Sequence, residues 1–96
     1  MVGDTYAVLQ SVAGGSYLEI KPSAGQELII HNIFHPGAIE LRLVDGSGNE
    51  CSFFEEDGKN LVTNMYFHLT NSQYLRVYNG SGGAMNVAVD GIVSKE

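Results

Sequence analysis

The sequence predicts an all-β protein: an antiparallel β-sandwich of jelly-roll type, with about eight short strands and little or no helix. Three observations support this fold class. Apolar and polar residues alternate in several short segments, which is the period of a strand with one buried face. The 12 glycines stand mostly at the ends of these segments, where turns between strands are expected. No connection is long enough for a crossover helix, so a parallel βαβ architecture is excluded.

The N-terminal part of the chain predicts two strands. Residues 5–12 are apolar enough for a first strand. An equal alternative is that residues 1–13 form an extended arm that becomes ordered against a partner. The second strand is expected at residues 16–21, where Leu18 and Ile20 share one face and charged residues the other.

The central part of the chain predicts three further strands. Residues 22–25 contain Pro and Gly in the order that a turn requires. Residues 27–34 then form a more deeply buried strand, and residues 38–44 show the cleanest alternation in the chain. The segment 45–49 is rich in Asp, Gly and Asn, which predicts a hairpin loop to a returning strand at residues 50–56.

The C-terminal part predicts the last three strands, at residues 61–70, 73–78 and 84–93. A glycine-rich loop at residues 79–83 separates the final two. In the first of these strands, the side chains expected on one shared face are Met65, Phe67 and Leu69.

Composition limits the classes of function. A chain of 96 residues is expected to form one domain, residues 1–96, with a modest core. Its formal net charge of −6 argues against nucleic acid and against an anionic membrane surface as partners. A lone cysteine, Cys51, and the lack of a basic start with a long apolar run predict folding in a reducing cytoplasm, without a signal peptide or a spanning helix.

One window has the spacing of a calcium-binding loop. Its oxygen ligands would be Asp45, Ser47, Asn49 and Glu56, at the first, third, fifth and twelfth positions. The sixth position, where that loop needs Gly, is Glu50, so a hairpin turn is the preferred interpretation. A looser acidic site is an alternative to a solvated turn, and it would consist of Glu50, Glu55, Glu56 and Asp57.

No catalytic constellation is visible, so we expect no enzyme activity, no cofactor and no metal. His35 is expected in a loop, and His31 and His68 on outward faces, at spacings that do not form a zinc site. A triad of His68 with Ser72 or Cys51 lacks the strained turn that presents a nucleophile, and Cys51 fits a small buried residue at the start of a strand.

One strand carries a candidate interaction patch. Alternation places Tyr74, Arg76 and Tyr78 on one face, which we interpret as the outward face. Tyrosine and arginine are typical of protein interfaces and of sugar-stacking platforms, and ordinary half-exposed sheet residues are the competing explanation. Tyr17 and Tyr66 extend the patch only if their strands lie alongside.

Two stretches resemble small virion proteins of tailed bacteriophages. Residues 16–27, with Tyr-Leu-Glu-Ile-Lys-Pro followed by Gly-Gln-Glu, and the Ile-His-Asn-Ile of residues 30–33 are similar to a strand–turn–strand pattern of those proteins. The Leu-Thr-Asn-Ser-Gln-Tyr-Leu of residues 69–75 resembles a strand pair found there. The resemblance implies a β-sandwich that decorates or cements the phage head, is often trimeric, and brings no catalytic residues.

The expected function is therefore a non-enzymatic structural protein of the virion. It is made in the host cytoplasm, self-associates as a homotrimer, and binds the major capsid protein on the outside of the head. The alternative is a carbohydrate-binding or receptor-binding module of a tail or fibre, which would use Tyr74, Arg76 and Tyr78 to stack on a sugar. A calcium-dependent module is the third possibility.

Overall fold

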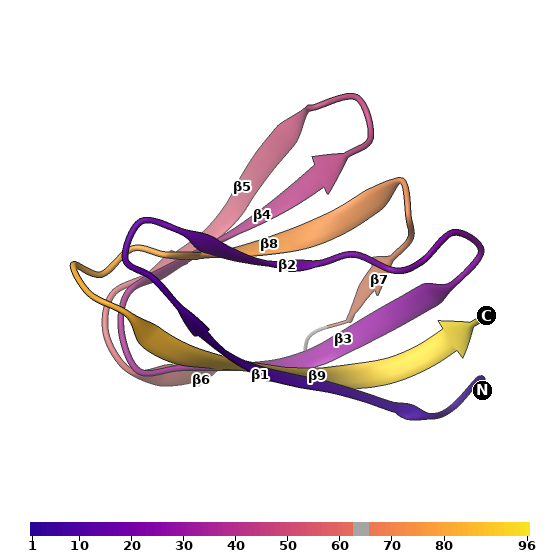
Figure 1. Cartoon of the computed structure of the whole chain (residues 1–96), viewed down its shortest axis with the longest axis horizontal. Helices are drawn as coiled ribbons and strands as arrows, with labels where there is room; N and C mark the ends of the chain where they lie inside the picture. Colours follow the sequence, from indigo (N-terminus) through magenta and orange to yellow (C-terminus); the bar gives the residue numbers. More distant parts are fainter. Residues whose placement is uncertain (63–65) are drawn as a thin grey trace.

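The computed structural model describes residues 1–62 and 66–96 and shows two antiparallel sheets packed face to face. Figure 1 shows the sheets as two layers that diverge toward the β4–β5 hairpin, with both chain ends at the same side of the molecule. The described residues contain no helix that is long and apolar enough to cross a membrane. The predicted all-β sandwich is confirmed.

Each sheet is named here by its strands. Sheet A has the order β1-β9-β3-β6, with β7 also paired to β3. Its strands are β1 (Thr5–Val12), β9 (Met85–Lys95), β3 (Glu27–His35), β6 (Asn60–Val62) and β7 (Phe67–Leu69). Sheet B has the order β2-β8-β4-β5. Its strands are β2 (Tyr17–Ile20), β8 (Gln73–Asn79), β4 (Ile39–Asp45) and β5 (Glu50–Glu56).

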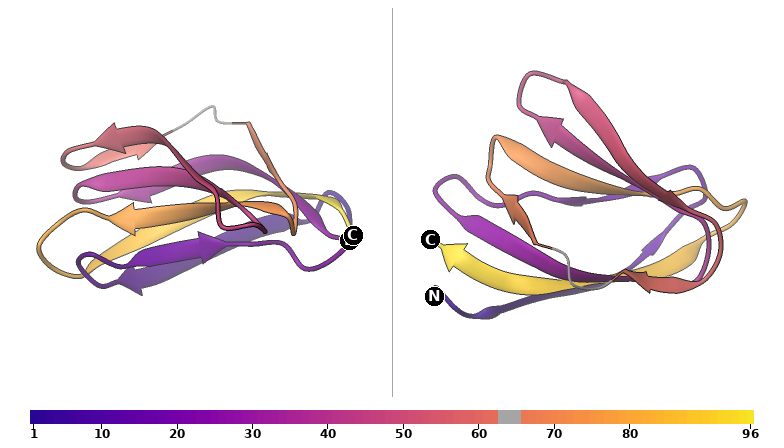
Figure 2. Two further views of the ribbon diagram at one scale, coloured as in Figure 1. Left: turned by 90° about the horizontal axis from the view of Figure 1, so that it is seen from above. Right: turned by 180° about the vertical axis from the view of Figure 1, so that it is seen from behind.

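The connectivity is that of a jelly roll. If β6 and β7 count as one interrupted strand, the chain is a long hairpin in which β1 pairs with β9, β2 with β8, β3 with β6 and β7, and β4 with β5. This hairpin is rolled up, so that β9 also pairs with β3 and β8 with β4. Figure 2 shows the result from two further directions, with the chain crossing between the layers at the corners. The jelly-roll topology expected from the sequence is therefore also present.

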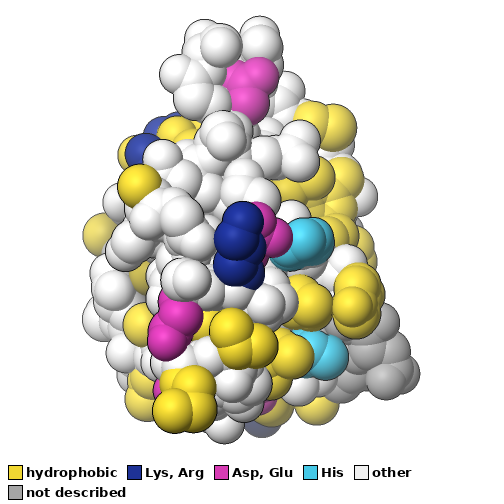
Figure 3. Space-filling view, turned by 90° about the vertical axis from the view of Figure 1, so that its right-hand side faces the viewer, with side chains coloured by type: hydrophobic (Ala, Val, Ile, Leu, Met, Phe, Trp, Pro, Cys, Tyr) yellow, Lys and Arg dark blue, Asp and Glu magenta, His cyan; other side chains and the backbone are white. Residues whose placement is uncertain are grey.

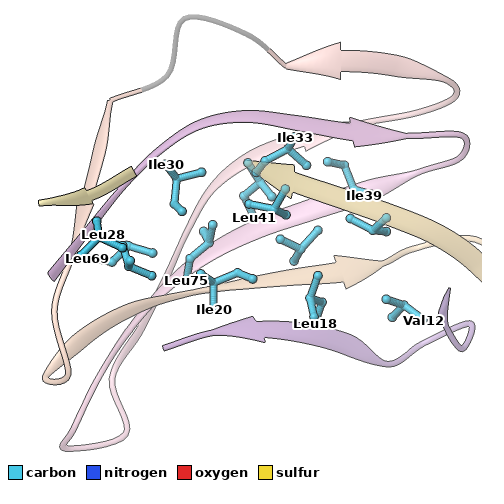
Figure 4. Close-up of a cluster of buried hydrophobic side chains, with 14 residues drawn as sticks. Val12, Leu18, Ile20, Leu28, Ile30, Ile33, Ile39, Leu41, Leu69 and Leu75 are labelled. Carbon is cyan, nitrogen blue, oxygen red and sulfur yellow. The ribbon is translucent and has the colours of Figure 1, made fainter. Parts of the chain in front are cut away.

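The core lies between the sheets and follows the predicted alternation. It contains 14 buried apolar side chains, contributed by both sheets (Figure 4). Leu18 and Ile20 of β2 point into it, as predicted, and so do Ile39 and Leu41 of β4. Full burial of one such side chain contributes roughly 1.5–3 kcal/mol to the free energy of unfolding.

The predicted strand boundaries agree with the structure to within two residues, except for the strand predicted at residues 61–70. Residues 5–12 form a sheet strand, β1, rather than a free arm. The single strand predicted at residues 61–70 is instead two three-residue strands, β6 and β7. Leu69 is buried as predicted, Phe67 is half-buried, and Met65 lies outside the described residues.

A β-bulge breaks the alternation of faces that is expected in a strand such as β5. The register between β4 and β5 shifts between Leu41 and Arg42, so that Phe54 opposes Leu41 and Ser52 opposes Arg42. Phe53 and Phe54 therefore both pack against the core, although strict alternation separates them. Cys51, expected to be a small buried residue, is exposed.

Asn79 at the end of β8 ties a corner of the sandwich together. Its side chain is buried and makes four hydrogen bonds. The amide nitrogen donates to the carbonyl oxygens of Val12 (2.8 Å) and Gly83 (2.9 Å), and the amide oxygen accepts from the backbone N–H and the hydroxyl of Ser81 (2.8 and 2.6 Å). These contacts join the end of β1 to the loop between β8 and β9, where the chain passes between the sheets.

Candidate interaction surfaces

The outer face of sheet B carries a cluster of stacked aromatic and guanidinium groups. We call it the tyrosine–arginine cluster, and it consists of Tyr17, Arg42, Arg76 and Tyr78. The rings of Tyr17 and Tyr78, which are directly opposite each other on β2 and β8, have centroids 5.0 Å apart. The guanidinium of Arg76 lies 4.5 Å from the centroid of the Tyr17 ring, and that of Arg42 lies 4.1 Å from the centroid of the Tyr78 ring.

Carboxylates neutralise the cluster. Arg42 and Arg76 are directly opposite each other on β4 and β8, an arrangement that is unfavourable without compensation. Glu50 accepts hydrogen bonds from both guanidinium groups and from the hydroxyl of Tyr78, each at 3.1 Å. Glu40 accepts from Arg42 at 2.7 Å, and Glu19 accepts from Arg76 at 3.1 Å. Every cation of the cluster is thus paired with a carboxylate of the same face.

These bonds shift the protonation of the carboxylates. The hydrogen bond from the Tyr78 hydroxyl, together with Arg42, lowers the pKa of Glu50 below its ordinary value. The hydrogen bonds from Arg42, and then from Ser52, lower the pKa of Glu40 in the same way. Both side chains therefore stay ionised in mildly acidic solution, and the face stays internally paired.

The three residues of the predicted patch lie together on this outer face, but they are covered to different degrees. Arg76 and Tyr78 are half-buried members of the cluster. Tyr74 is only 7% exposed, and the amine of Lys21 lies over its ring at 4.7 Å. A sugar needs an open ring face on which to stack, and the contacts of Tyr74 and Tyr78 leave little room for one.

The structure also shows which of Tyr17 and Tyr66 lies next to this patch. Tyr17 lies alongside the patch and joins it. Tyr66 lies apart from it, and its ring forms an edge-to-face pair with the His31 ring at a centroid distance of 6.1 Å.

The outer face of sheet A is different, because apolar side chains cross it in a straight line. We call this line the apolar row, and its members are Leu9, Ala88, Phe34 and Leu61. Leu9 of β1 is opposite Ala88 of β9, Ala88 is opposite Phe34 of β3, and Phe34 is opposite Leu61 of β6. Leu9 is 72% exposed, Phe34 43% and Leu61 41%.

A groove accompanies the apolar row. Its volume is about 490 Å³, and Pro36, Lys59 and Asn86 line it together with the row itself. His35 also reaches the groove wall, although its side chain is buried. Exposed apolar side chains that adjoin one another beside a groove are typical of a place where another protein binds.

The prediction for His35 was also wrong, because this residue ends β3 instead of lying in a loop. Its Nδ1 donates a hydrogen bond to the carbonyl oxygen of Gly37 at 2.8 Å. Its Nε2 lies 3.0 Å from Oε1 of Glu56, and neither atom has a hydrogen-bond partner among the described residues. The ring is thus a buried polar group that anchors the turn after β3.

Polar side chains lie next to the apolar row on the outer face of sheet A, and the exposed Ile92 of β9 lies beyond them. Asn32 donates to Asp90 at 2.7 Å. His68 is exposed on this face, as predicted, and its Nε2 lies 2.6 Å from Oε1 of Glu27, whose other oxygen lies 3.6 Å from the Lys95 amine. Figure 3 shows a basic, an acidic and a histidine side chain adjoining on this end of the molecule, next to hydrophobic side chains. Polar groups therefore border the apolar row on one side.

The calcium spacing has a structural explanation in the hairpin turn. The carboxylate of Asp45 accepts hydrogen bonds from the backbone N–H of Ser47 (2.8 Å), the backbone N–H of Asn49 (3.0 Å) and the side-chain amide of Asn49 (3.0 Å). These bonds, that of the Asn49 side chain first, lower the pKa of Asp45. Within residues 1–62 and 66–96, no three His, Cys, Asp or Glu side chains converge as a metal-binding group.

Sequence reasoning missed the apolar row. Phe34 lies at the end of a segment, residues 27–34, that is apolar at most positions. The pattern therefore predicts that both faces of this strand are buried. Leu9 alternates with Val8 in an uncharged strand, which gives no sign of which face is inside. An available signal was the absence of charge on residues 5–12, since a strand with one solvated face normally carries some.

Comparison with known proteins gives a likeness of fold alone. No family model matches the chain. No curated protein matches it either. Among solved structures, the chain is similar to the NLP core of Drosophila, which was studied for pentamer formation and histone binding. The TM-score is 0.55 and the sequence identity 13%, over 93% of this chain and 96% of that one.

Proposed function

We propose that the protein is a non-enzymatic structural protein that binds the outside of a bacteriophage capsid and decorates or stabilises the head. The observation that carries this proposal is the apolar row on the outer face of sheet A. Its partner is the major capsid protein, and several copies of the chain act together, as the homotrimer that the resemblance to virion proteins implies.

The contrast between the two outer faces supports a protein partner for sheet A. The polar groups of the tyrosine–arginine cluster are already paired with one another, so a partner there gains few new hydrogen bonds. The apolar row offers exposed Leu and Phe side chains beside a groove, and covering them removes apolar surface from water.

Oligomerisation fits the size and the fold of the chain. A domain of 96 residues has a small core, and contacts with other copies add buried surface. The NLP core, which has a similar fold, forms a pentamer, so a ring of copies is compatible with this architecture. Several weak contacts per oligomer multiply into lasting attachment to a shell of repeated sites. The net charge of −6 keeps the free protein soluble before assembly.

The alternative of a carbohydrate-binding module gains less support from the structure. It needs open aromatic faces, whereas Tyr74 lies under Lys21, and Arg42 covers the ring of Tyr78. A glycan array distinguishes the two functions, because a capsid-binding protein gives no saturable sugar signal.

The direct test uses heads of a phage that encodes the chain, prepared without it. We expect the purified protein to bind them with a fixed number of copies per head and to raise the melting temperature of the capsid. Phe34→Asp, placed in the apolar row, is expected to abolish binding, and Ser47→Asp, in the exposed β4–β5 turn, to leave it intact. Failure of the unmodified protein to bind the heads, or equal binding by both variants, contradicts the proposal.

A further inference from the structure

The edge strand β1 is the starting point, because it differs from the other edges of the sandwich. Strand edges present unpaired backbone groups, and proteins normally protect them by short length, charge or proline. The edge strand β2 has only four residues, and β6 and β7 have three each. The remaining edge strand of sheet B, β5, carries Glu50, Glu55 and Glu56. All of these edges are protected.

By contrast, β1 has no protection of this kind. It is eight residues long, with the sequence Thr-Tyr-Ala-Val-Leu-Gln-Ser-Val, and contains neither a charged residue nor a proline. It pairs with β9 on one side, and no hydrogen bond from a described residue reaches its other side. Such an edge is a template for pairing with another strand.

The backbone groups that β1 offers can be assigned. Val93 of β9 donates to the carbonyl oxygen of Asp4 and accepts from the N–H of Gly3. Hydrogen bonds alternate along an antiparallel pair, so every second residue from there bonds to β9, beginning with Tyr6. The residues between them direct their N–H and C=O groups to the open edge, and these are Thr5, Ala7, Leu9 and Ser11.

We propose that β1 pairs with β1 of a second copy of this chain, antiparallel about a two-fold axis, so that two A sheets become one continuous sheet. In a two-fold contact the same surface of both copies meets. The edge of β1 can take part on both sides of such a contact, because it is long, uncharged and, among the described residues, unpaired. A head-to-tail ring through the edges of sheet A would instead join β1 to the short strands β6 or β7, which offer few backbone partners.

The apolar row supports the same occupant. It ends at Leu9 on the open edge, where its exposed fraction is greatest. A two-fold axis perpendicular to the sheet keeps both outer faces on one side and places Leu9 opposite Leu9 or Ala7 of the other copy. The two rows then form one apolar strip across both subunits. The inference concerns the isolated protein and does not rest on binding to capsids.

The mass of the protein in solution is the first test. Pairing through β1 predicts an even number of copies, either two or six where a three-fold contact also forms, in light scattering over a range of concentrations. A trimer overturns the pairing and leaves the proposed function standing. A monomer overturns the pairing and also the homotrimer of the proposed function, whereas binding to capsids is tested separately on the heads.

Two variants of the edge and one control test the contact itself. Ala7→Pro removes an N–H from the open edge and leaves the bonds to β9 in place, and Leu9→Lys puts a charge where the two copies meet. Each is expected to weaken pairing by roughly tenfold or more, equivalent to about 1.4 kcal/mol. Leu61→Lys, at the far end of the same row, is expected to leave the pairing unchanged. Loss of pairing in Leu61→Lys but not in the edge variants overturns the inference.

Amide hydrogen exchange in the unmodified protein gives a readout that does not depend on how a variant folds. Pairing predicts that the N–H groups of Ala7 and Leu9 are protected as strongly as those of Tyr6 and Val8. The measurement is made at a concentration where light scattering gives an even number of copies. Fast exchange at Ala7 and Leu9, beside slow exchange at Tyr6 and Val8, would then show that another surface joins the copies and would refute the role of β1.

Discussion

Removal of the Asn79 side chain tests how the corner of the jelly roll is held. Asn79→Ala deletes four hydrogen bonds, two to the carbonyl oxygens of Val12 and Gly83 and two from Ser81. The Ser81 groups lie in a half-exposed loop and regain water as a partner. The Gly83 carbonyl still has the Ser81 hydroxyl as a donor at 2.8 Å. The carbonyl of Val12 lies in the interior, so the loss falls mainly on its hydrogen bond and on the space that is left.

The expected cost is about 2–3 kcal/mol, since a buried group left without its hydrogen bond costs roughly 1–3 kcal/mol. For a domain of this size the melting temperature should fall by about 10–20 °C. The assay is urea unfolding followed by circular dichroism, with all proteins at one concentration because association would shift the midpoint.

Asn71→Ala is the matched control for this prediction. Asn71 is exposed, and its side-chain amide donates one hydrogen bond, to the carbonyl oxygen of Pro22 at 3.0 Å. Its loss should cost about 0.5–1 kcal/mol. If both variants lose the same small amount, Asn79 does not hold the corner, and the reasoning is refuted.

Three further predictions concern Gly91 of β9, the dependence of stability on acidic pH, and calcium. Gly91→Ala should lower the free energy of unfolding, measured with urea, by more than about 3 kcal/mol, because the new Cβ would overlap the carbonyl oxygen of Ile29. Gly46→Ala is the control and should leave that free energy unchanged, because its new Cβ would lie within 4 Å of no described residue other than its neighbours in the chain. The pKa of Glu50 is lowered in the folded state. The ionised side chain therefore stabilises the fold at pH values above the ordinary carboxyl pKa of about 4.3, and this stabilisation is lost as the pH falls through the pKa that Glu50 has in the folded protein. Glu50→Gln should therefore be less stable at neutral pH, and lose less stability on acidification, than the unmodified protein or Asp57→Asn. The same loss of unfolding free energy between neutral and acidic pH in all three proteins, measured with urea, would contradict this. Calcium and a chelator should leave the melting temperature unchanged, because hydrogen bonds within the turn already engage the Asp45 carboxylate; a rise with calcium would revive the metal site.

Local patterns were sufficient for the strands and for the general fold. Apolar residues at every second position, such as Leu18 and Ile20 in β2, predicted which side of a strand is buried. The glycines predicted the turns. These signals are readable because a strand places successive side chains on opposite faces, so the pattern depends only on neighbours in the chain.

The prediction failed where a residue's environment depends on distant segments. Phe53 and Phe54 both reach the core because a bulge against β4 breaks the alternation. His35 is buried because Glu56 and the turn after β3 close around it. Tyr74 is covered because the side chain of Lys21, far away in sequence, lies over it.

The sequence by itself determined an acidic all-β chain, its strands and much of the core of the sandwich, since these depend on composition and on a period of two residues. Only the tertiary structure decided which surfaces are open to a partner. Strand order places Leu9, Ala88, Phe34 and Leu61 in one row and leaves the uncharged β1 at an edge. It also brings Arg42 and Arg76 to the same carboxylate. Pairing between strands distant in sequence creates these surfaces, and the linear order of residues carries little trace of that pairing.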